Sequence, residues 1–156
     1  MVRFALLVGL LISVPATSNS QSLDPPKQVV VSHSGDDRVG ELLAYELREQ
    51  IKMSAQMTLA QIADMRHGVK LNLVTLDPRE GERLEGNVAV LSATWIYYAF
   101  DGENEVELFL TSTVGQVGEN RVESVARSLV STTDEQRRAV PVELRELAYY
   151  LKRAED

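Results

Sequence analysis

The segment from Gln28 to Ser54 constrains the fold more than any other part of the sequence. It opens with the β-branched run Val29–Val31, bounded by prolines before it and a glycine after it, which predicts a short buried strand. Asp36 and Asp37 follow and can accept hydrogen bonds from the free amides that begin a helix. Apolar residues then recur every four positions and predict an amphipathic helix from Asp37 to Met53: Val39, Leu43, Leu47 and Ile51. Because a strand and a helix alone bury too little apolar surface, later strands must complete a sheet beneath this helix.

Three more strands are predicted downstream. Val69 to Leu76 alternates apolar and polar residues, as a half-buried strand does, and we expect it to lie parallel to the first strand because a crossover joins them. Val88 to Phe100 and Glu105 to Val114 predict a hairpin, whose turn is either Asp101–Gly102 or the four residues from Asp101 to Asn104. The stretch from Ala55 to His67 fits either a second short helix or an irregular crossover.

Two helices are predicted near the C-terminus. Gly115 to Gly118 reads as a turn, and an apolar stripe predicts a helix from Arg121 to Val130 that ends at Thr132, Thr133 and Asp134. Pro141 precedes a further helix from Val142 to Ala154. The predicted fold class is therefore α/β: a two-layer sandwich with a mixed four-stranded sheet, helices on one face and an additional C-terminal helix.

The hairpin divides its side chains between two faces, and both turn lengths keep the same faces together. One face is assigned to the core: Leu91, Ala93, Trp95, Tyr97, Val106, Leu108 and Leu110. The other sets apolar side chains among hydroxyls and the acids Glu105 and Glu107, which is typical of a modest protein interface. It supplies the candidate partner-binding residues: Ile96, Tyr98, Phe109, Thr94 and Thr111. The alternative is that the C-terminal helix covers this face and makes it ordinary core of a three-layer domain.

The N-terminal residues have the pattern of a secretory signal peptide. Arg3 precedes an apolar run from Phe4 to Val14 and then small residues suited to cleavage after Ala16 or Ser20. The run is much shorter than the roughly 20 apolar residues that span a bilayer. We therefore expect residues 1–20 to be removed, residues 21–27 to form a flexible mature N-terminus, and residues 28–156 to form one α/β domain without stable membrane insertion.

Composition limits the compartment and the partners. The 156-residue chain has no cysteine, so packing rather than disulfides must hold an exported domain, which suits a bacterial periplasm. Its formal net charge of −7 argues against nucleic acid and anionic membranes as partners. Nothing in the sequence indicates a cofactor, and the oligomeric state is left open.

One group of residues could carry chemistry. His33, Asp36 and Asp37 follow the first predicted strand, where open α/β sheets place their sites, and an imidazole with two carboxylates could hold a metal that activates water. The alternative is structural: the aspartates cap the helix and His33 is a loop residue hydrogen-bonded to backbone. A metal-dependent hydrolase centred on these three residues is therefore the second functional hypothesis.

The layout also suggests a resemblance. The run VVVSHSGDDRVGELLAYELREQI, followed by VKLNLVTL, resembles the opening strand and helix of small α/β domains of bacterial envelope proteins, such as the N-terminal domain of TolB-type periplasmic proteins. The run TSTVGQVGENRVESVARSLVSTTDEQ resembles small exported bacterial proteins without an assigned activity. The resemblance implies export and an α/β fold, and it carries over no site residues. The first hypothesis is a periplasmic, non-catalytic binding or adaptor domain that recognises another envelope protein.

Overall fold

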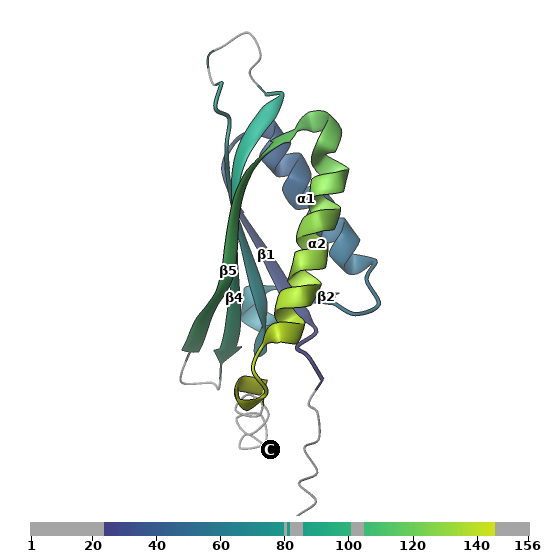
Figure 1. Ribbon diagram of the computed structural model, residues 1–156, viewed down its shortest axis with the longest axis vertical. Coiled ribbons are helices and arrows are strands. Elements are labelled where there is room, and N and C mark those ends of the chain that lie inside the picture. The colour runs from purple at the N-terminus through teal and green to yellow at the C-terminus, as the bar shows by residue number, and fades with distance from the viewer. Residues whose placement is uncertain (1–23, 80, 82–85, 101–104, 146–156) are drawn as a thin grey trace, which may run out of the picture.

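The computed structural model describes residues 24–79, 81, 86–100 and 105–145 (Figure 1). The predicted signal peptide and most of the predicted C-terminal helix lie outside these residues. In chain order the elements are β1 (Gln28–Ser34), α1 (Arg38–Lys52), β2 (Thr58–Leu59), the 3-10 helix η1 (Ile62–Asp64), β3 (His67–Leu76), β4 (Val88–Phe100), β5 (Glu105–Gly118), the 3-10 helix η2 (Glu119–Arg121) and α2 (Val122–Ala139).

The sheet has five strands in the order β2-β1-β3-β4-β5, so the predicted count of four is wrong by one. The missed strand is β2, whose two residues pair in parallel with Gln28 and Val29. This strand and η1 replace the short helix considered for residues 55–67. β1 and β3 are parallel, as predicted, and β3, β4 and β5 are successively antiparallel. The mixed α/β architecture is therefore confirmed.

Helix α1 forms where the apolar periodicity predicts it. Asp37 is its N-cap, and the Asp37 carboxylate accepts a hydrogen bond from the Gly40 amide at 2.6 Å. The stripe of Val39, Leu43, Leu47 and Ile51 is at most 1% exposed and packs on the sheet. Both α1 and α2 lie on the same side of the sheet (Figure 1).

The β4–β5 hairpin pairs Phe100 with Glu105, as the four-residue turn predicts, and Tyr97 with Leu108. Trp95 and Tyr97 are buried on the helix side, so the predicted facing of β4 is confirmed. A β-bulge interrupts the register between Trp95 and Ile96, and Leu110 is its extra residue. Beyond the bulge Trp95 pairs with Thr111 rather than with Leu110.

Helix α2 is longer than predicted, and so is the strand before it. Gly115 to Gly118 continues β5, and Val117 is 1% exposed in the core, so the predicted turn there is wrong. The predicted helix break at residues 132–134 is wrong as well, because the Thr133 hydroxyl donates to the Leu129 carbonyl within the helix and accepts from the Trp95 indole at 2.8 Å. Residues 142–145 begin a further helical turn. Within the described part of the chain, no helix is both long and apolar enough to cross a membrane.

Candidate functional site

The side of the sheet opposite α1 and α2, called the open face here, carries a row of polar side chains between two apolar groups. Directly paired residues share a face, and the polar row runs across four strands: Ser32, Asn72, Thr94 and Ser112. On one side of this row Ile96 pairs with Phe109. On the other side are the apolar side chains Val74, Leu76, Val90 and Val114.

Several of these apolar side chains are strongly exposed. Phe109 is 61% exposed and Val114 is 73% exposed, while Val74 and Leu76 are each more than half exposed. Burying an aliphatic or aromatic side chain stabilises a fold by about 1.5–3 kcal/mol. A sheet face that belonged to the core would therefore not leave these side chains in water. The open face is thus an exposed apolar surface in the described structure.

Tyr98 does not belong to this surface, although the sequence analysis placed it there. It lies on the predicted face of β4 but is only 7% exposed, because it packs with Val30 and Met65. Met65 comes from the crossover between η1 and β3, which covers that end of the open face. Tyr98 is therefore a core residue of a small second cluster.

Thr111 also departs from the predicted set. The bulge at Leu110 changes which side of β5 each residue faces, so Thr111 pairs with Trp95 and lies on the helix side. Ser112 takes the place opposite Thr94. Of the five candidate residues, Ile96, Phe109 and Thr94 share the open face.

A cation borders this surface. The Lys70 ammonium lies 5.3 Å from the centre of the Tyr98 ring and forms an ion pair with Glu107 on β5. Lys70 is also the cross-strand neighbour of Ile96, so its aliphatic stem lies beside the apolar group. The open face thus has charged residues at the Tyr98 end, next to the apolar pair of Ile96 and Phe109.

The C-terminal segment follows the helix side as far as it is described. The Tyr97 hydroxyl donates a hydrogen bond to the Leu144 carbonyl at 3.2 Å, and Leu144 packs on the cluster of Tyr97, Ala99 and Val140. Burial raises the pKa of Tyr97, and the nearby Arg145 guanidinium partly opposes that rise. Through Arg145, the chain therefore does not cross to the open face.

The residues of the alternative site at the end of β1 make structural contacts in the described chain. Asp37 caps α1, and the His33 imidazole Nε2 lies 2.8 Å from the Thr75 hydroxyl on β3. Asp36 is exposed, and the described residues contain no group of three His, Cys, Asp or Glu side chains placed to hold a metal ion. Leu73 on β3 is the cross-strand neighbour of His33, and His67 lies six residues before Leu73 on the same strand. The two histidines are therefore roughly 20 Å apart.

The backbone before and within α1 approaches Thr75 closely. A Cβ placed on Gly40 would lie 1.9 Å from the Thr75 hydroxyl oxygen, and one placed on Gly35 would lie 2.6 Å from it. Thr75 is 4% exposed.

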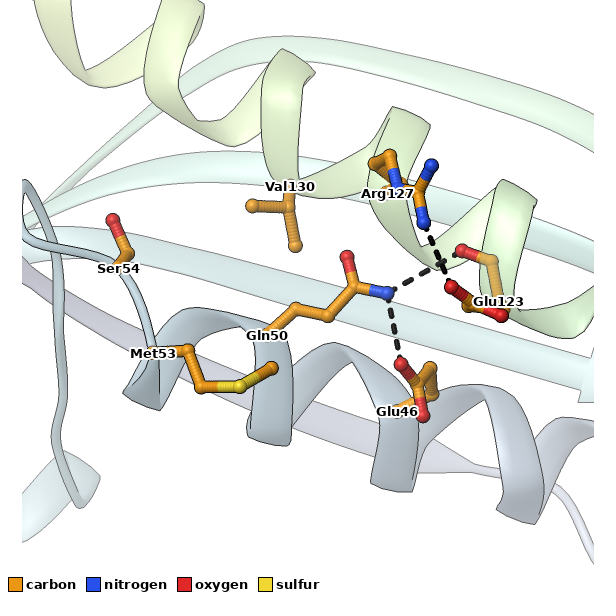
Figure 2. A pocket seen from close by; sticks show the side chains of 7 residues that line it. All are labelled: Glu46, Gln50, Met53, Ser54, Glu123, Arg127 and Val130. Atoms are coloured by element: carbon orange, nitrogen blue, oxygen red, sulfur yellow. Dashed lines mark hydrogen bonds and ion pairs between the residues drawn. The ribbon is translucent and has the colours of Figure 1, made fainter.

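Two pockets on the helix side are surface junctions. Figure 2 shows one of about 320 Å³ between α1 and α2, where Gln50 bonds to Glu46 at 2.9 Å and Arg127 pairs with Glu123 at 2.7 Å. Met53 on its rim is 76% exposed. The other, of about 370 Å³, includes Arg137 and Arg138, which share the Asp134 carboxylate. Their cations are already paired within the chain.

Three exposed residues of the open face were not predicted from the sequence: Val74, Leu76 and Val114. Val74 and Leu76 could have been found from the alternation in β3, which places them with Lys70 and Asn72 on the face away from the core. The position of Val114 on the open face could not have been predicted, because the bulge at Leu110 determines which face of the sheet Val114 lies on.

Comparison with known proteins assigns no family. No protein-family model matches the sequence, and no curated protein is similar to it. Among solved structures, a minor lipoprotein from Acinetobacter baumannii is 9% identical with a TM-score of 0.35, over 71% of this chain and 92% of its own. A hypothetical protein from Chlamydia trachomatis is 7% identical with a TM-score of 0.34, over 81% of this chain and 98% of its own. The rare lipoprotein B from Shewanella oneidensis is 14% identical with a TM-score of 0.24, over 81% of this chain and 99% of its own.

These values are too low to transfer a function or a site. Two of the three structures are bacterial lipoproteins, and none is described as a TolB-type domain. The resemblance to TolB-type domains therefore stays a prediction.

Proposed function

We propose that this chain is an exported, periplasmic, non-catalytic binding domain that recognises another envelope protein through the open face of its sheet. The observation that carries the proposal is the group of exposed apolar side chains on that face: Val74, Leu76, Phe109 and Val114. Both helices pack on the opposite side. Export is supported by the N-terminal pattern from Arg3 to Ser20.

The composition of the open face fits a protein partner better than a small molecule. Its apolar residues form two groups on one face of the sheet, separated by hydroxyl and amide side chains that can form hydrogen bonds across an interface. A small-molecule site would be concave and would bury most of its ligand. Exposed apolar side chains gathered on one face of a domain commonly mark a protein interaction site.

A substitution at Phe109 tests this proposal, and α1 offers a matched control. Phe109 on the open face and Tyr45 on α1 are both aromatic and both 61% exposed. We expect Phe109→Ala to weaken capture of an envelope partner from envelope extracts of the source organism by about tenfold or more, as loss of an interface anchor does. Tyr45→Ala should leave capture unchanged.

Stability measurements separate binding from folding. Both variants should unfold within about 0.5 kcal/mol of the wild type in urea, because both side chains are exposed. Equal capture by the Phe109 variant, the Tyr45 variant and the wild type would contradict the proposal.

A further inference from the structure

Strand β5 is an edge strand with little of the usual protection against pairing. It is 14 residues long, and β4 is its only strand partner in the described sheet. Edge strands expose a row of free backbone N–H and C=O groups, and proteins commonly protect them with lysine, proline or short length. The β5 sequence EVELFLTSTVGQVG contains neither lysine nor proline. Its one irregularity is the bulge at Leu110.

The bulge determines which β5 residues face the same way. Before it, Glu107 and Phe109 pair with open-face residues of β4, and after it Ser112, Val114 and Gln116 do so. Against β4 the register skips Leu110, so that Thr111 pairs with Trp95 and Phe109 pairs with the next residue, Ile96. An antiparallel strand that pairs on the free edge with the same skip keeps residues of one face together.

This geometry makes β5 complementary to a second copy of itself. If two β5 strands pair antiparallel about Ser112, Thr111 meets Thr113, and across the skipped Leu110 Phe109 meets Val114. The symmetry forms the Phe109–Val114 contact twice, with two strongly exposed apolar side chains brought together each time. Phe109 and Val114 both lie on the open face, and Thr111 and Thr113 both lie on the helix side, so each pair joins residues of the same face.

The charge along β5 favours the same arrangement. Its only charged residues, Glu105 and Glu107, are at one end. Antiparallel pairing places Glu107 opposite Gln116 and Glu105 opposite Gly118, whereas parallel pairing in register would set each glutamate against its own copy in a chain of net charge −7.

We propose that β5 is a self-association edge, on which two copies of this chain pair antiparallel about Ser112 into one continuous sheet. The two open faces then form one surface. The proposal concerns the protein alone, so it stands or falls independently of the envelope partner proposed above.

Disulfide trapping tests the register directly, because the chain contains no cysteine. Directly opposed residues in an antiparallel pair have Cα atoms about 4.5–5.5 Å apart, which is within disulfide range. Ser112→Cys should therefore give a disulfide-linked dimer on mild oxidation of the purified protein. Ser32→Cys is the matched control, since Ser32 is an exposed serine in the same polar row but on β1, at the opposite end of that row from β5.

Sedimentation of cysteine-free variants provides the second measurement. Val114→Glu, on the edge strand, should raise the dimer dissociation constant by about tenfold or more. Val74→Glu, in the same cross-strand row but on the interior strand β3, should leave it within about threefold of the wild type.

Three results would overturn the proposal. The first is a wild-type protein that stays monomeric at every concentration tested. The second is equal cross-linking of the Ser112 and Ser32 variants, which would show random collision. The third is equal dissociation by both glutamate variants, which would show that the open faces stack on each other.

Discussion

Trp95 shows how one side chain joins the two layers of the molecule. It is 1% exposed in the centre of β4, and its indole N–H donates to the Thr133 hydroxyl on α2 at 2.8 Å. A buried indole needs such an acceptor, because an unsatisfied buried donor costs about 1–3 kcal/mol. The contact fixes the position of α2 along the sheet and also explains why a threonine is accepted within that helix.

We therefore expect Thr133→Val to lower the free energy of unfolding by about 1–3 kcal/mol, since it keeps the shape and removes the acceptor. Thr132→Val is the control, because Thr132 is the neighbouring threonine in α2, is only partly buried and is not the acceptor of the Trp95 hydrogen bond. The control should stay within about 0.5 kcal/mol of the wild type. Urea unfolding followed by tryptophan fluorescence measures both variants. Equal losses would indicate a general effect of valine in α2 rather than a lost hydrogen bond.

At the scale of elements, the close approach of α1 to β3 positions the helix layer. Gly40 in the first turn of α1 faces Thr75, with no space for a side chain between them. The approach also brings the Asp37 cap and His33 against Thr75, which turns the polar end of β1 into a structural cluster. These contacts anchor the helix, and the metal site at His33, Asp36 and Asp37 stays a prediction.

Gly40→Ala should destabilise the protein although alanine is the better helix former. A Cβ at this position would lie 1.9 Å from the Thr75 hydroxyl and 2.7 Å from the Thr75 Cβ, so α1 would have to shift, at a cost of about 1–3 kcal/mol. The control is Gly115→Ala in β5, where no atom lies within 4 Å of an added Cβ. Thermal unfolding of both variants checks this expectation. A Gly40 variant as stable as the wild type would show that α1 packs less closely on β3.

Elements with local patterns could be predicted from the sequence, and elements set by distant contacts could not. The helix predicted over 37–53 is observed as α1 with its cap at Asp37, because periodicity and capping are local properties. The two-residue strand β2 exists only through its pairing with β1, and α2 continues past Thr133 because Trp95 is there. At the candidate site Ile96 and Phe109 came together as predicted. The bulge moved Thr111 to the helix side, and Met65 buried Tyr98.

On the scale of the whole molecule, the described part of the chain is one sheet with helices on one side and exposed apolar side chains on the other (Figure 1). A cysteine-free domain is held by packing, and the packing is concentrated on the helix side. Among the described residues, the open face contributes the small cluster of Val30, Met65 and Tyr98 to the core. We propose that the rest of that face is available to a partner, and this is the central claim.

Site-specific photo-crosslinking in living cells tests the central claim most directly. A benzoylphenylalanine replaces Phe109 on the open face in one strain and the equally exposed Tyr45 on α1 in another. Illumination should join the Phe109 variant to an envelope protein, as a discrete adduct identified by mass spectrometry and distinguished by its mass from a dimer of this chain. The Tyr45 variant should give no such adduct. The absence of an envelope-protein adduct from Phe109, or the same adduct in equal yield from Tyr45, would contradict the claim.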